Sequence, residues 1–268
     1  MRIDELKGPC QGKSAAAIDY LIKNTDEYLR AKEAGVEADI LSVYAAGVLF
    51  LRDEAQDTRG ALWRAAEQGM AVTGAEKGLI EAGRTLTWVP SGPVKQGAAL
   101  GKDNHFVRFL NDGTTFDLSN PGTTLNCWEA ILLSAMLGGL LDNGTSLIRL
   151  YEDPQRFDKL LTQALVSGAG RPYRPNAPLG TPVRGDIVLF SGLDHVAIAT
   201  GRNDSSQTEI LSFWPAPALP LNKVRPGTQT VMLRTSIEAI GAWLVVNLPD
   251  EPNNITFGAP DWPVLNQS

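Results

Sequence analysis

The chain has 268 residues and a formal net charge of −6. This acidic balance, with no basic run to offset it, excludes nucleic acid as the main partner. Two cysteines and two histidines supply neither a disulfide framework nor the three or four ligands of an ordinary zinc site. We therefore expect no metal, no cofactor and no disulfide between the two cysteines.

The N-terminus lacks the apolar core of a Sec signal peptide, and residues 43–51 form its most apolar run. That run is far shorter than the roughly 20 residues that span a bilayer. The sequence therefore predicts synthesis in the cytoplasm and no membrane span.

The first hundred residues have the spacing of helices. Residues 14–34 carry apolar side chains on one helical face and end at Gly35, and we expect further helices at 36–53, 58–69 and 75–82. The turn-rich segment 90–93 follows them. These patterns predict a helical N-terminal subdomain over residues 1–95.

Alternation with period two begins after residue 101. Residues 105–110 and 114–118 flank Asp112-Gly113 and predict a hairpin. Downstream we expect a helix at 154–166, a loop at 168–182, and strands at 186–190, 195–200, 209–214, 230–234 and 242–246. The tail, residues 249–268, is rich in proline and asparagine and is expected to be irregular.

Cys127 begins a predicted helix. Thr123, Thr124 and Asn126 precede it and offer side chains that cap free backbone N–H groups. A thiol in the first turn lies in the positive field of the helix dipole, which favours the nucleophilic thiolate. Cys127 is therefore the candidate nucleophile, and a buried structural thiol is the alternative.

His195 opens a predicted strand after the short loop 191–194. An imidazole at a strand start can face a cleft and pair with the thiol. His105 lies 22 residues before Cys127 and is the weaker candidate for the base. Cys10 has neither a helix nor a partner in the sequence and is interpreted as incidental.

A cysteine helix followed by a histidine strand resembles the papain-like cysteine hydrolases, in particular the NlpC/P60 branch. Cys127-Trp128 is similar to the start of the papain-type nucleophile helix. Gly185-Asp186, an apolar strand and His195-Val196 are similar to the NlpC/P60 histidine motif. The resemblance implies an α+β catalytic domain over residues 96–248, in which the nucleophile helix packs on an antiparallel sheet.

The resemblance also implies roles for neighbouring residues. Ser212 lies where the family carries an asparagine, histidine or glutamine that orients the histidine, and Trp214 matches the tryptophan that shields it. Glu209, Asp194 or a backbone carbonyl are alternatives to Ser212. Pro121 replaces the papain oxyanion glutamine, so the backbone N–H of Cys127 with Asn126 or Thr124 would replace its donor. The remaining substrate-binding candidates are Trp128, Trp214 and Asp194.

These residues predict acyl transfer through a thioester. The acyl acceptor and the cleft decide between a peptidoglycan amidase or endopeptidase and a glutamine or asparagine deamidase or transglutaminase. The resemblance implies a bacterial effector that a dedicated secretion system exports, with a peptide or protein amide as substrate and an immunity or chaperone protein as partner. The alternatives are a catalytically inactive papain-like binding module and a functional surface on residues 1–95.

Overall fold

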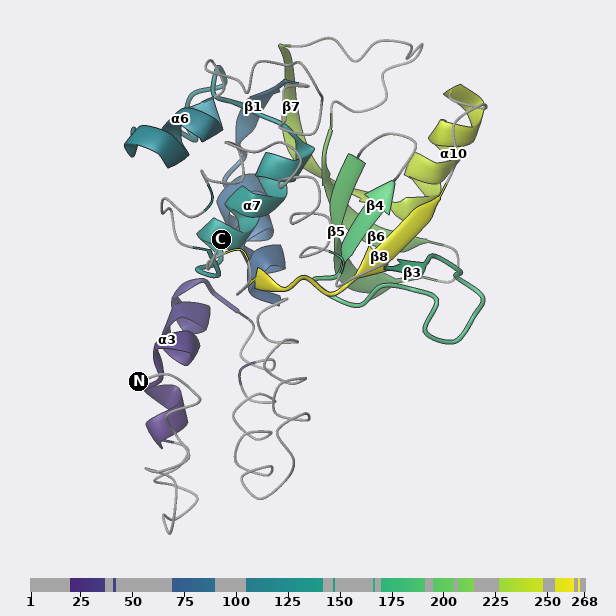
Figure 1. Ribbon diagram of the computed structural model, residues 1–268, viewed down its shortest axis with the longest axis horizontal. Helices are drawn as coiled ribbons and strands as arrows, with labels where there is room; N and C mark the ends of the chain where they lie inside the picture. Colours follow the sequence, from purple (N-terminus) through teal and green to yellow (C-terminus); the bar gives the residue numbers. More distant parts are fainter. Residues whose placement is uncertain are drawn as a thin grey trace.

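The computed structural model describes residues 20–36, 69–89, 105–141, 170–190, 195–204, 207–214, 227–247 and 254–262, together with residues 41, 147, 166 and 265. These residues form an α+β structure around a curled sheet (Figure 1). The α+β class expected from the sequence is therefore confirmed. No helix among the described residues has the length and apolar character needed to cross a bilayer.

The sheet has eight strands in the order β2-β1-β7-β6-β5-β4-β8-β3. Neighbouring strands are antiparallel except β1 and β2, which are parallel. The strands are β1 (Thr85–Trp88), β2 (Thr124–Leu125), β3 (Arg171–Pro172), β4 (Ile187–Phe190), β5 (His195–Asn203), β6 (Thr208–Phe213), β7 (Thr228–Ser236) and β8 (Ile255–Gly258). Four predicted strands correspond to β4, β5, β6 and β7.

Helices cover both faces of this sheet. On one face, Val196 and Ile198 of β5 pack in the same core cluster as α7 (Cys127–Leu137). On the other, Ala197 and Ala199 pack in the cluster of α10 (Ile237–Asn247). Successive strand residues point to opposite faces, so β5 lies between the two helices.

The N-terminal helices differ in part from the prediction. The described part of the expected helix 14–34 is interrupted at Asn24, and Thr25 then caps α3 (Asp26–Glu33), with the Tyr28 N–H donating to its Oγ1 at 3.2 Å. Gly35 ends the helix, as predicted, at φ +72°. Residues 69–75 are helical and continue into the π-helix η2 (Glu76–Glu81). The helices expected at 36–53, 58–69 and 154–166 fall almost entirely outside the described residues.

The predicted hairpin at 105–118 is wrong, because residues 105–112 form a helix, α6 (His105–Asp112). The buried side chains of α6 are Phe106 and Leu110, which are four residues apart and therefore lie on one helical face. Gly113 has a φ of +66°, and its N–H donates to the Phe109 carbonyl at 3.1 Å. Asp-Gly thus ends a helix here rather than closing a two-residue turn.

The strand expected at 242–246 is also wrong, because this run belongs to α10. Ser236 starts that helix, accepting a hydrogen bond from the Ala239 N–H at 3.1 Å. The tail is not irregular throughout, since β8 pairs with β4 and β3. Phe257, Trp262 and Leu265 of the tail are buried.

The boundaries at residues 95 and 248 stay predictions. Two strands outside residues 96–248 nevertheless belong to the sheet: β1 pairs with β7, and β8 pairs with β4. The sheet is therefore built from all three predicted parts of the chain.

Candidate active site

Cys127 is the first residue of α7, as the sequence predicts. Asn126 caps the helix: its Oδ1 accepts the Glu129 N–H at 2.9 Å, while the Glu129 carboxylate accepts the Asn126 N–H at 2.8 Å. This reciprocal pair is a capping box, which satisfies two free backbone donors at once. It fixes the first turn of α7 and, with it, the backbone that carries the sulfur.

The Cys127 side chain is 7% exposed. Burial raises the pKa of the thiol to about 12, although the backbone N–H groups of Val196, Trp128 and Cys127 hydrogen-bond to the sulfur and act in the opposite direction. The negative charge of Glu129 adds to the increase. In this conformation Cys127 is therefore a neutral thiol at physiological pH, and the sulfur lies beside the backbone at the start of β5.

His195 is the first residue of β5 and is 2% exposed. Its Nε2 lies 2.9 Å from Ser212 Oγ on β6. The imidazole lies between two aromatic rings, with centroids 5.6 Å from that of Phe190 and 5.2 Å from that of Trp214. Trp243 of α10 meets Trp214 edge-on at 4.9 Å. The ring of Trp214 thus lies against that of His195, and its role as a shielding residue stays a prediction.

The second ring nitrogen of His195 is buried without a partner. Among the described residues, Nδ1 has no hydrogen-bonding atom in reach, and neither ring nitrogen is hydrogen-bonded to Cys127 Sγ. Burial lowers the pKa of the imidazole to about 3, so His195 is neutral. The structure thus does not bring the two groups together. Cys127 packs with Val196 on the α7 face of β5, whereas the His195 ring lies with Phe190 and Trp214 on the opposite face, which α10 covers.

Three other predicted site residues have different surroundings. Thr124 Oγ1 accepts the backbone N–H of His105 at 3.0 Å and lies 2.8 Å from its Nδ1. Both groups therefore hold the start of α6 against β2. Trp128 packs within the core cluster of α7. Asp194 lies outside the described residues.

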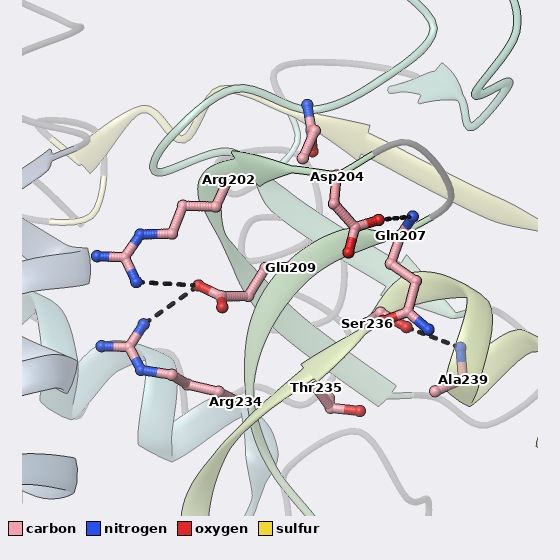
Figure 2. Close-up of a pocket in the computed structure, with 9 residues that line it drawn as sticks. Arg202, Asp204, Gln207, Glu209, Arg234, Thr235, Ser236 and Ala239 are labelled. Carbon is pink, nitrogen blue, oxygen red and sulfur yellow. Dashed lines mark hydrogen bonds and ion pairs between the residues drawn. The ribbon is translucent and has the colours of Figure 1, made fainter.

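Glu209, one alternative partner for His195, points elsewhere. Its Oε1 binds Arg234 at 3.2 Å and Arg202 at 3.9 Å, in a surface pocket of about 410 Å³ (Figure 2). Arg202 follows His195 by seven residues along β5, which at about 3.3 Å per residue is roughly 23 Å. Glu209 does not orient His195, and the contact to Ser212 is the one that the structure contains.

Sequence reasoning missed two residues that shape the site. Glu129 follows Asn126 by three residues, which is the spacing of a capping box and could have been read from the sequence. Phe190 is paired with His195 across β4 and β5, a contact that depends on strand register. No group of three or more His, Cys, Asp or Glu side chains gathers among the described residues to hold a metal ion.

The buried imidazole predicts a loss of stability in acid. Between pH 6.5 and about 3 the unfolded chain protonates His195 while the folded chain does not, so protonation favours unfolding as the pH falls. Replacing His195 with glutamine should remove about 3 kcal/mol of the decline between pH 7 and pH 4. Urea denaturation from pH 7 to pH 4, with His105→Gln as control, measures it. Equal slopes in the wild type and His195→Gln would contradict the burial of this ring.

Comparisons with known proteins do not assign the chain to a family. No family model, no curated protein and no solved structure matches it.

Proposed function

We propose that the protein is a cysteine-dependent amide hydrolase of the papain-like type, with Cys127 as nucleophile and His195 as base. One observation carries the proposal. The Cys127 sulfur, at the start of a helix, accepts the backbone N–H of Val196, while the adjacent His195 has Nε2 held by Ser212. Nδ1 is then the nitrogen left to exchange a proton with the sulfur or the leaving amine, and this exchange requires the His195 ring to leave the α10 face of β5.

The reaction follows the proposed pairing. His195 Nδ1 takes the proton from Cys127 Sγ as the sulfur attacks the substrate carbonyl. The protonated ring then gives that proton to the leaving amine, which breaks the C–N bond and leaves a thioester. Water attacks the thioester, His195 accepts its proton, and the carboxylic acid leaves as the thiol is restored.

The described conformation supports a closed resting state. Burial favours the neutral thiol of Cys127 and the neutral imidazole of His195, because the charged form of each group would lose its hydration. Entry of a substrate would bring polar groups and water to the sulfur, and in that setting the helix dipole favours the thiolate. The proposed catalysis therefore requires a rearrangement at the start of β5 that moves His195 from the α10 face to the face that carries Cys127.

The oxyanion donors proposed from the sequence are the Cys127 N–H with Asn126 or Thr124. Asn126 directs its Oδ1 to the Glu129 N–H, which fixes the side chain next to the nucleophile. Thr124 is engaged by His105 and is the less suitable donor. Loss of one such donor typically costs about 10²–10³ in rate.

The substrate that we propose is a bacterial cell-wall peptide, which makes the protein an amidase or endopeptidase type of effector. Its export by a dedicated secretion system, and an immunity or chaperone protein as partner, belong to the same proposal. The same thioester chemistry would also serve a glutamine or asparagine deamidase or a transglutaminase, because only the acyl group and its acceptor differ.

A second candidate is a catalytically inactive papain-like module that binds peptides or proteins. The burial of Cys127 and the lack of a hydrogen bond between its sulfur and His195 favour it. Under this proposal the same residues serve as a packed core beneath a binding surface.

Alkylation of Cys127 by iodoacetamide, in a Cys10→Ser background, separates the two candidates. A hydrolase should react with a pH midpoint below the ordinary thiol value of about 8.5, because the reagent reaches the sulfur only in the open state. His195→Ala should remove that shift, while His105→Ala should leave it. A pH midpoint at or above 8.5, with the same value in the wild type and in His195→Ala, supports the binding module.

Mass spectrometry identifies the substrate. Purified peptidoglycan and glutamine-bearing proteins are incubated with the wild type or with Cys127→Ala. A cleaved peptide bond, a gain of one dalton and a new crosslink correspond to hydrolysis, deamidation and transamidation. The absence of any product that depends on Cys127 would overturn the proposed hydrolase.

A further inference from the structure

Another pocket lies between α6, the segment that follows it, and the second half of α7. Its volume is about 530 Å³, which falls within the range of about 300–1,000 Å³ that small-molecule sites occupy. Leu133, Met136 and Leu137 line it from α7, because positions i, i+3 and i+4 share one helical face. Cys127 does not line this pocket, which is therefore separate from the candidate active site.

Most of the pocket wall is apolar. Phe109 of α6 and Phe116 of the following segment meet with their ring centroids 5.6 Å apart, and Leu118 and Leu141 also line the pocket. Met136 is half-buried, and its flexible thioether can adapt to the shape of an apolar ligand. A concave apolar wall with few polar groups is typical of small-molecule sites.

Arg30 of α3 is the one charged residue among those that line the pocket, and no acidic side chain lines it. Arg30 is exposed, and within the described part of the chain its guanidinium makes a single hydrogen bond, from Nε to the Asp26 carbonyl at 3.4 Å. The terminal N–H groups of Arg30 are therefore available to a ligand. Their planar arrangement matches the two oxygens of a carboxylate.

The backbone N–H groups that line the pocket are largely engaged. Gly113 donates to the Phe109 carbonyl at 3.1 Å, and Gly139 donates to the Met136 carbonyl at 2.9 Å. The Thr114 N–H donates to a neighbouring side chain at 3.0 Å. An extended peptide gains its affinity largely from main-chain hydrogen bonds, which these groups cannot supply. The lining therefore favours a ligand with one anionic end and an apolar remainder.

We propose that this pocket binds a fatty acid, with its carboxylate on Arg30 and its hydrocarbon chain against the apolar side chains of α6 and α7. Removal of the chain from water supplies the affinity, and the ion pair with Arg30 fixes the orientation. The inference goes beyond the proposed hydrolase, because no residue of the pocket takes part in the thioester mechanism.

Calorimetric titration of the full chain with decanoate tests the assignment. We expect one decanoate per chain, with a dissociation constant of roughly 10–100 μM. Arg30→Gln should weaken binding by about 10–100-fold, because it removes a charged hydrogen-bond donor. Decanol has the same chain without the carboxylate and should bind the wild type and Arg30→Gln equally. Lys32→Gln, at an exposed position of α3, is the matched control and should bind decanoate like the wild type.

A second variant tests the apolar wall. Leu137 is 36% exposed, so Leu137→Glu should fold, which its urea midpoint checks. Its added negative charge should lower the affinity for decanoate by about tenfold or more. Cys127→Ala should bind decanoate like the wild type, so a failure of the hydrolase proposal leaves this test intact.

Three results would overturn the assignment. The first is the absence of saturable binding of decanoate, and the second is equal affinity of the wild type and Arg30→Gln for it. The third is tighter binding of a leucine-terminated peptide that depends on Arg30, which would assign the pocket to a peptide carboxyl terminus. Sedimentation of the ligand-free chain is the remaining check, because self-association that Leu137→Glu abolishes would assign the pocket to a second copy and also overturn the proposal.

Discussion

Cys127→Ala is expected to abolish amide hydrolysis, with a loss of roughly 10⁴-fold or more. The Cys127 sulfur forms the thioester in the proposed mechanism, and alanine has no atom that can replace it as nucleophile. Cys127→Ser should lose nearly as much, because a hydroxyl is a much weaker nucleophile when its base is poorly aligned. Product formation by mass spectrometry gives the rate, and the urea midpoint shows that each variant is folded.

Substitutions of His195 and Ser212 should lower the rate of hydrolysis by successively smaller factors. His195→Ala should lower the rate by about 10²–10⁴ through loss of the proton acceptor. Ser212→Ala should lower it less, because Ser212 acts only through the 2.9 Å contact to Nε2. Full activity in Cys127→Ala would show that the thioester mechanism is wrong, and a Ser212 effect larger than that of His195 would show that the orienting role is misassigned.

Trp262→Ala should destabilise the fold by about 3–5 kcal/mol, the usual cost of removing a large buried aromatic side chain. Trp262 is 1% exposed and packs in the core cluster that contains α7. Its indole Nε1 is buried with no hydrogen-bond partner among the described residues, so the side chain contributes through packing. Urea denaturation gives the change as a shift in midpoint at constant slope.

Trp262→Phe is the matched control. Phenylalanine fills much of the same space and removes an unsatisfied N–H, so its cost should be clearly smaller than that of alanine. If alanine and phenylalanine had equal effects, the N–H rather than the ring would be the important feature. An unchanged midpoint for Trp262→Ala would mean that residues 254–262 do not belong to the core.

The elements that could be predicted are those with strong local signals. The helix at Cys127 follows capping residues, and β4, β5 and β6 are short apolar runs between turns. The hairpin prediction failed because His105-Phe-Val-Arg-Phe-Leu fits both periods, and Asp-Gly ends helices as well as hairpins. The helix α10 was missed because its apolar run could also be read as a buried strand.

The candidate site was also predicted only in part. Cys127 and His195 were found because their residue types and the patterns that flank them can be read from the sequence. Their mutual geometry was not, because the burial of both groups and the stacking of Phe190 on His195 depend on strand register and on packing across the sheet. Glu129 had a local signal, the three-residue spacing from Asn126.

The place of β8 has a consequence for biosynthesis. This strand lies between β3 and β4, so a ribosome must release residue 258 before β4 gains its second neighbour. Phe190, which packs on His195, belongs to β4. Since pairings between distant segments form late, β4 and Phe190 leave the ribosome well before the strand that supports this aromatic contact.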